Sequence, residues 1–144
     1  MNTYTKKLKF LSITGQIDQE GNPIMEPVEK QASFYALSQT DQRQSRLFFM
    51  MRPLYREVKV IGEEQGLMIA DPSIMYDLTK YAIDVLLIVD EKFTETDKKE
   101  FLNDAFAVLD FGERFLEEAT PFFLKYFTNY RLSPKTVKEP ETGL

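Results

Sequence analysis

The sequence predicts a mainly α-helical single domain, a bundle of five or six helices with at most a short β-strand or hairpin at its N-terminus. Three observations lead to this prediction. The chain has 144 residues, a length that favours one domain. A clear helix start occurs at Asp71-Pro72, and another helix starts at Thr94 or Thr96. Apolar residues elsewhere recur at steps of three and four, which is typical of one buried helix face.

The helical domain is expected to cover residues 1–130, with residues 1–29 forming a strand-and-loop arm. Residues 4–14 show the partial alternation of a short strand, and a hairpin that pairs residues 7–14 with 24–29 fits the turn residues between them. The tail, residues 131–144, contains two prolines and almost no apolar side chains, so it is predicted to be disordered.

The middle of the chain is predicted to be helical. Residues 30–38 are expected to form a short helix, and a stronger helix begins after Thr40, a plausible N-cap. Pro53 should kink or break this second helix, and Gly62 or Gly66 should end it. Its apolar face follows steps of four, three, four and three along Leu47, Met51, Leu54, Val58 and Ile61.

A third helix begins at Asp71-Pro72, an N-cap followed by proline at the first helical position, and is expected to run to about Val89. The next begins at Thr94 or Thr96, where the sequence has the spacing of a capping box.

Apolar residues then recur at helical spacing from Phe101 to Ala119. This pattern fits one long helix or two helices broken near Phe111-Gly112. Pro121 is expected to interrupt it, leaving residues 121–130 as a short aromatic helix.

Composition argues against most enzyme classes. The chain has no cysteine and no histidine, which excludes zinc sites of the usual kind, thiol nucleophiles and Ser-His-Asp triads. It contains no phosphate-binding glycine loop. Residues 18–29 resemble a calcium-binding loop in spacing, but Pro23 occupies the position that requires glycine. We therefore predict that the protein is not an enzyme and binds no cofactor or metal.

Charge is unevenly distributed. Residues 61–118 hold five basic and fifteen acidic side chains, a balance of −10, whereas residues 1–60 hold nine and six, a balance of +3. An acidic surface argues against a nucleic-acid partner, because phosphate contacts require a basic face. No apolar run is long enough to span a membrane, and the first residues lack the features of a signal peptide. We expect a cytoplasmic protein.

Among the acidic residues, Asp84 is the one that interrupts an apolar run, so it is a candidate for burial and for pairing with Lys80 or with an arginine from residues 43–56. The remaining acids are expected to form a solvated face.

Two segments carry more apolar side chains than one core can easily absorb. Residues 47–51 are apolar at every position, and residues 121–127 contain four aromatic side chains. We interpret these segments as partly core and partly a binding or self-association surface, such as a groove for an amphipathic helix. The candidate partner-binding residues are Phe48, Phe49, Met50, Met51, Leu54, Tyr55, Phe122, Phe123, Tyr126 and Phe127.

The layout of residues 30–130, with the segments QASFYALSQTDQRQSRLFFMMRPLYREV, DPSIMYDLTKYAIDVLLIV and FLEEATPFFLKYF, resembles the tail assembly chaperones of long-tailed bacteriophages of Gram-positive hosts. The resemblance implies a non-enzymatic chaperone that binds apolar helical segments of the tape measure protein and keeps it soluble during tail assembly. It also implies a homo-oligomer or open helical assembly, located in the host cytoplasm and absent from the mature virion.

Two other readings remain open from the residues themselves. One is a dimeric phage or bacterial regulatory or interaction protein that uses the same apolar surface. The other is a carboxylate-dependent enzyme that binds magnesium, which would require acids converging in a concave pocket.

Overall fold

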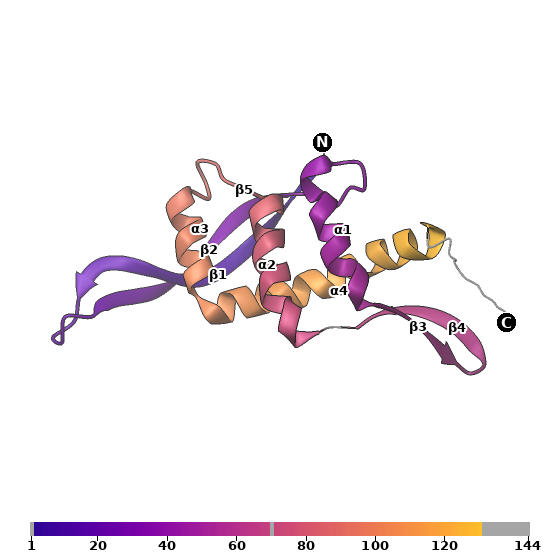
Figure 1. Cartoon of the computed structure of the whole chain (residues 1–144). Helices are drawn as coiled ribbons and strands as arrows, with labels where there is room; N and C mark the ends of the chain where they lie inside the picture. Colours follow the sequence, from indigo (N-terminus) through magenta and orange to yellow (C-terminus); the bar gives the residue numbers. More distant parts are fainter. Residues whose placement is uncertain (1, 70, 131–144) are drawn as a thin grey trace.

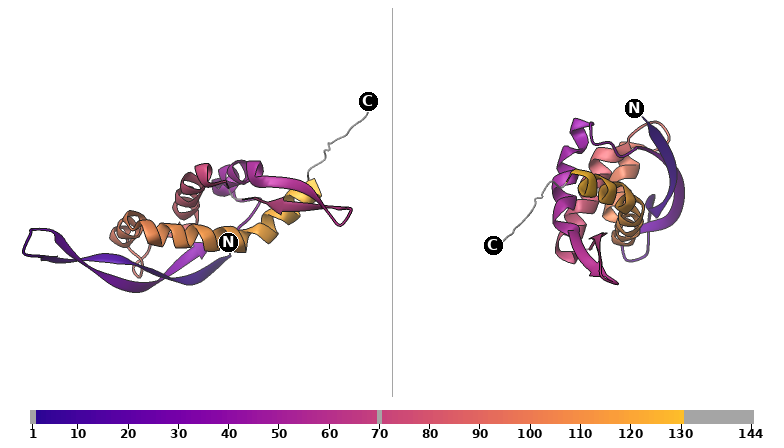
Figure 2. Two further views of the ribbon diagram at one scale, coloured as in Figure 1. Left: turned by 90° about the horizontal axis from the view of Figure 1, so that it is seen from below. Right: turned by 90° about the vertical axis from the view of Figure 1, so that its right-hand side faces the viewer.

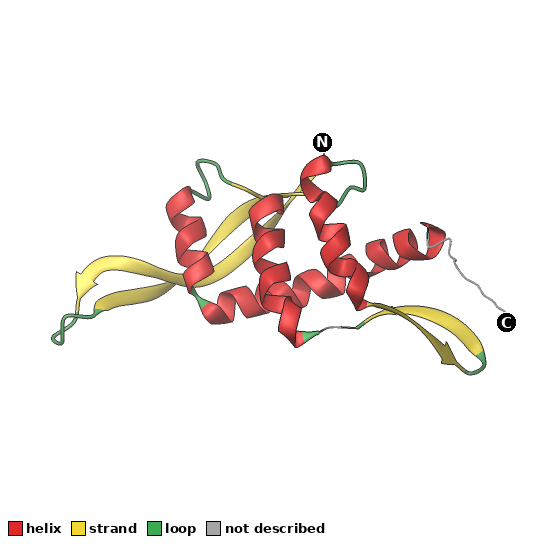
Figure 3. Ribbon diagram, in the orientation of Figure 1, coloured by secondary structure: helices red, strands yellow, loops and turns green. Residues whose placement is uncertain are grey.

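The fold mixes helices and strands. A computed structural model describes residues 2–69 and 71–130, so the predicted disorder of residues 131–144 lies outside the described residues. Within this part the chain forms four α-helices and five strands, the strands arranged in two antiparallel sheets (Figures 1 and 3). The prediction of a bundle of five or six helices is therefore wrong. In chain order the elements are β1 (Thr3–Ile17), β2 (Pro23–Tyr35), η1 (Gln42–Gln44), α1 (Ser45–Met51), η2 (Arg52–Leu54), β3 (Tyr55–Val60), β4 (Glu63–Met68), α2 (Pro72–Leu86), β5 (Leu87–Ile88), α3 (Glu95–Asn103) and α4 (Ala105–Tyr130).

The N-terminal hairpin is far longer than the short element expected. β1 and β2 pair antiparallel from Thr3↔Tyr35 outward, and β5 adds two residues to the other edge of β2. The predicted helix over residues 30–38 is wrong, because residues up to Tyr35 belong to β2. Ala32 and Phe34 are buried two residues apart, which is the period of a strand with one face on the core.

The helix predicted to run from Thr40 to the glycines after residue 61 ends much earlier. Leu47, Met51 and Leu54 are buried as the helical pattern requires, but after Pro53 the chain turns into the β3–β4 hairpin. Proline breaks the helix here rather than kinking it, since its ring and missing N–H are incompatible with a helix interior. Ile61 and Gly62 form the hairpin tip, with φ angles of 54° and 80°.

The two helix starts identified from the sequence are confirmed. The Asp71 side chain accepts a hydrogen bond from the Ser73 N–H at the start of α2. Thr94 and Asp97 form a reciprocal capping box at the start of α3. α2 ends at Leu86 rather than near Val89, because the next two residues pair with β2.

Helix α4 is continuous through Phe111-Gly112, where a break was one of two alternatives, and through Pro121, where an interruption was expected. The interruption falls at Asp104, between α3 and α4, and not at Phe111-Gly112. Asp104 caps the new helix by accepting hydrogen bonds from the N–H groups of Phe106 and Ala107. Pro121 lies inside α4 and does not end it, so residues 121–130 are its last turns rather than a separate helix.

The molecule is elongated around α4. The β1–β2 sheet lies on one side of α4, while α1 and α2 lie on the other (Figure 2). Aromatic side chains from the sheet, the loop before α3, α3 and α4 form the centre of the core. Ring contacts link Phe10, Phe34, Phe93, Phe101 and Phe111 into one cluster. The β1–β2 hairpin and the β3–β4 hairpin project from opposite ends of the body (Figure 1).

Candidate functional site

The predicted partner-binding residues come together, but only some of them are accessible. The Phe48 ring packs between α1 and the end of α4, with its centroid 5.1 Å from that of Phe123 and 4.8 Å from that of Tyr126. The Tyr55 and Phe127 rings lie 5.7 Å apart. Met51, Leu54, Tyr55, Phe123 and Phe127 are buried core residues, whereas Phe48, Met50, Phe122 and Tyr126 are half-buried and Phe49 is 78% exposed.

The accessible part of this cluster is a small hollow beside α1. It has a volume of about 410 Å³ and is lined by Gln39, Ser45, Phe48, Phe49, Arg52, Tyr126 and Phe127. We call it the α1 hollow. Its aromatic walls and single arginine have the chemistry that an apolar side chain next to an acidic one would need.

A second concavity lies where α2 crosses α4, and we call it the α2–α4 groove. Its volume is about 770 Å³, within the range of ligand-binding clefts. Thr79 and Gly112 are both buried at the crossing. A Cβ atom on Gly112 would lie 2.4 Å from the Thr79 hydroxyl oxygen, so the two helices approach closely only because residue 112 is glycine. Apolar side chains predominate in the lining, which includes Met75, Tyr76, Leu102, Val108, Leu109 and Leu116.

Sequence reasoning did not identify the α2–α4 groove. A usable signal was present, because residues 105–109 are apolar at all five positions and one helix face cannot bury them all. Ala107 and Val108 are buried, whereas Leu109 is 58% exposed and Phe106 is 83% exposed. On α2, Tyr76 is exposed at the opposite lip of the groove.

Charged side chains border the groove. Lys80 and Glu113 contribute to its lining, and a neighbouring polar hollow shares Lys80 and Leu102 with it. Asp84 lies in that hollow with a side chain that is 65% exposed, and its carboxylate accepts a hydrogen bond from Lys98 Nζ at 2.8 Å. The expected burial of Asp84 and its expected pairing with Lys80 or an arginine are therefore wrong.

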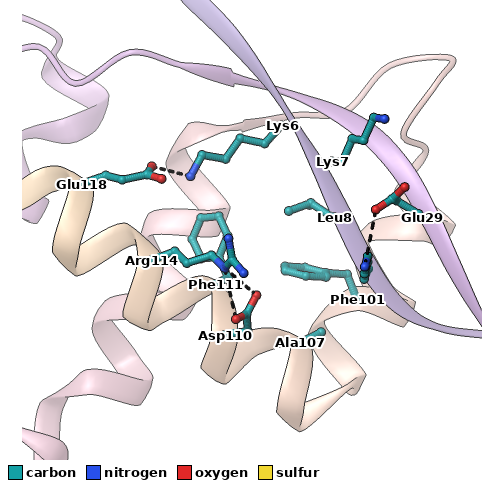
Figure 4. Close-up of a pocket in the computed structure, with 11 residues that line it drawn as sticks. Lys6, Lys7, Leu8, Glu29, Phe101, Ala107, Asp110, Phe111, Arg114 and Glu118 are labelled. Atoms are coloured by element: carbon teal, nitrogen blue, oxygen red, sulfur yellow. Dashed lines mark hydrogen bonds and ion pairs between the residues drawn. The ribbon is translucent and has the colours of Figure 1, made fainter.

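A third pocket, between β1 and α4, is dominated by ion pairs (Figure 4). Lys6 pairs with Glu118, and Arg114 pairs with Asp110 at 3.0 Å; Phe101 and Phe111 also line the pocket. These paired charges compensate each other, so the pocket offers little net charge to a ligand. We interpret it as a contact that holds the sheet on α4.

A further ion pair fixes the hairpin against α3. The buried Asp97 carboxylate accepts hydrogen bonds from Lys30 Nζ at 2.7 Å and from the Thr94 N–H at 2.9 Å. Burial opposes ionisation of Asp97, but the hydrogen bonds from Lys30 and Thr94 outweigh it and hold the pKa of this carboxyl below its ordinary value. The geometry makes Asp97 a structural residue.

Comparison with protein-family models, with curated proteins and with solved structures found no match for this chain. Across residues 2–69 and 71–130, no group of three or more acidic side chains is arranged to hold a metal ion. None of the helices in this part of the chain is long and apolar enough to cross a membrane.

Proposed function

We propose that the protein is a binding protein that holds an apolar helical segment of another chain in the α2–α4 groove, and that it acts as an assembly chaperone. The observation that supports this most directly is the groove itself, an apolar concavity between two helices with Tyr76 and Leu109 exposed at its lips. Amphipathic helices commonly bind in such grooves through side chains spaced three and four residues apart.

The groove lining itself contains one cation, Lys80, and one acid, Glu113, so the charge argument rests on the elements that form the groove. Residues 61–118, which include α2, α3 and the first half of α4, carry a balance of −10. A helix with one apolar face and basic flanks would bury its apolar side chains in the groove and place its cations near these acids. The excess of acidic side chains on these elements also suits a chaperone, because net charge keeps a complex soluble.

The family resemblance supplies the identity of the partner in this proposal. Tail assembly chaperones bind a long tape measure protein with many exposed apolar side chains. On this reading the groove shields one apolar segment of that chain until the tail tube polymerises around it.

The test is a fluorescence anisotropy titration with a labelled synthetic helix that has leucines at positions i, i+3, i+4 and i+7 and lysines on its flanks. A scrambled peptide of the same composition is the control. We expect saturable binding of the helix, and at least about tenfold weaker binding by the Leu109→Asp variant, because a buried unpaired carboxylate is costly.

Phe106→Asp is the matched control variant. Phe106 is on the same helix and is more exposed than Leu109, but it does not line the groove. It should bind the peptide as the wild type does. Equal binding of the scrambled peptide, or an equal loss in both variants, would contradict the proposal. Co-expression with a tape measure protein, scored by the solubility of that partner, then tests its identity.

A further inference from the structure

The outer part of the β1–β2 hairpin has no protein support on either face. We define the outer arm as residues 14–27. Every residue from Gly15 to Pro27 is exposed, and the arm projects beyond the body of the molecule (Figures 1 and 2). An isolated two-stranded ribbon is only marginally stable in water. Its apolar side chains Ile17, Ile24 and Met25 nevertheless face solvent.

The free edges of the hairpin are protected against addition of another strand. On the β1 edge, the N–H groups of Leu11 and Ile13 donate to the carboxylates of Asp104 and Glu100. On β2, Pro23 and Pro27 lack the N–H groups that a further strand would need. The two carboxylate contacts lie next to the outer arm and the two prolines lie within it, so the β2 edge of the arm is suited to contacts through side chains rather than through backbone pairing.

The outer arm is purely acidic. It contains Asp18, Glu20 and Glu26 and no lysine or arginine, a balance of −3. The Asp18 carboxylate accepts hydrogen bonds from N–H groups of the turn. Among the described residues no ion pair involves Glu20 or Glu26.

The complementary surface lies on the same chain. Residues 42–56 contain four arginines and no acidic residue, and one of these arginines, Arg43, pairs with the preceding Asp41 at 3.2 Å. Arg46 and Arg52 flank the exposed Phe49 at three residues on either side, and so are its neighbours on the helix surface. Within the described part of the chain neither is in an ion pair, and their guanidinium groups lie over the rings of Tyr81 and Tyr55.

Helix α1 and the last turns of α4, which line the α1 hollow, are separated from the outer arm by α2 and α3 in the elongated molecule (Figure 1), so an arm is not positioned to reach the hollow of its own chain. We propose that the outer arm of one copy docks on the surface formed by Arg46, Phe49 and Arg52 of a second copy, which we call the Phe49 surface. In this contact an apolar side chain of the arm enters the α1 hollow, and Glu20 and Glu26 face Arg46 and Arg52. Such a contact joins two different surfaces and repeats head to tail.

The proposal is tested by sedimentation velocity over a concentration series at low salt. We expect association that rises with protein concentration and weakens with added salt, since exposed charge pairs are screened. The arm variant Glu20→Lys/Glu26→Lys and the face variant Arg46→Glu/Arg52→Glu should each associate at least about tenfold more weakly than the wild type.

An equimolar mixture of the two variants is the decisive control. The arm of the first variant is now basic and meets the now acidic Phe49 surface of the second variant. The acidic arm of the second variant meets the unaltered basic surface of the first. Mixing should therefore restore association. Restoration also shows that both variants are folded. A wild type that stays monomeric throughout the series, or a mixture that stays as dissociated as its components, would overturn the proposal.

This inference does not rest on the proposed chaperone function, because the two surfaces share no residue. Leu109→Asp should leave self-association unchanged. Failure of the charge reversal therefore says nothing against peptide binding in the α2–α4 groove, and loss of peptide binding says nothing against the arm contact.

Discussion

The crossing of α2 and α4 makes a sharp prediction about Gly112. Alanine at this position would place its Cβ 2.4 Å from the Thr79 hydroxyl oxygen and 3.2 Å from the Thr79 methyl carbon. Both atoms belong to a buried side chain on the facing helix, so the helices must separate or Thr79 must adopt a poor rotamer. Overpacking of this kind costs roughly 1–3 kcal/mol.

An opposing term comes from the helix itself. Gly→Ala in a helix interior stabilises by about 1 kcal/mol, because glycine loses more backbone entropy on folding. Gly112→Ala should therefore lower the free energy of unfolding of the wild type by about 1 kcal/mol, the amount by which a mid-range clash exceeds the propensity gain.

The same substitution should change sign when Thr79 is alanine. Only the Cβ of residue 79 then remains, at 3.4 Å, an ordinary contact distance. In the Thr79→Ala background, Gly112→Ala should raise the free energy of unfolding by roughly 1 kcal/mol. The double-mutant cycle predicts a coupling of about 1–3 kcal/mol, measured by urea unfolding of four proteins.

A coupling near zero, or a wild type stabilised by Gly112→Ala, would show that the two helices are farther apart at this point than described. It would also remove the floor of the α2–α4 groove as the structure defines it.

Three further predictions concern other parts of the fold. The pKa of Asp97 is lower in the folded than in the unfolded chain, so its ionised form stabilises the fold above about pH 4. This stabilisation is lost as pH falls through the folded-state pKa. Asp97→Asn should therefore flatten the acid part of the curve of unfolding free energy against pH, measured by urea unfolding. Phe123→Ala should cost about 3–5 kcal/mol of unfolding free energy, whereas Phe49→Ala should cost less than about 0.5 kcal/mol because Phe49 is exposed; similar losses in thermal unfolding would contradict the assigned burial. Ile61→Asn should raise the free energy of unfolding by roughly 1 kcal/mol, since asparagine tolerates the positive φ angle that isoleucine adopts at the β3–β4 tip, and unchanged stability would count against that backbone geometry.

The exposure of part of the apolar segment on α1 could be predicted in outline but not residue by residue. The run of apolar side chains from Leu47 to Met51 was predicted to be only partly buried, and Phe49 is exposed while Leu47 and Met51 are buried; its role as a binding surface stays a prediction. Which residue faces outward depends on where α1 packs against α4. The α2–α4 groove depends on a helix crossing that brings together residues more than thirty positions apart, such as Thr79 and Gly112, and no local pattern reports it.

Local chemistry determined the features that the sequence predicted correctly. The start of α2 at Asp71-Pro72 and the capping box of Thr94 and Asp97 depend on side chains that satisfy N–H groups two or three residues away, so they are readable without the fold. Tertiary structure decided the rest. Residues 30–35 form a strand because β1 supplies their hydrogen-bond partners, and α4 continues through Pro121 while the aromatic side chains next to it pack on Phe48. Gly112 is a contact point rather than a helix end, because only a residue without a Cβ allows α2 to pass so close.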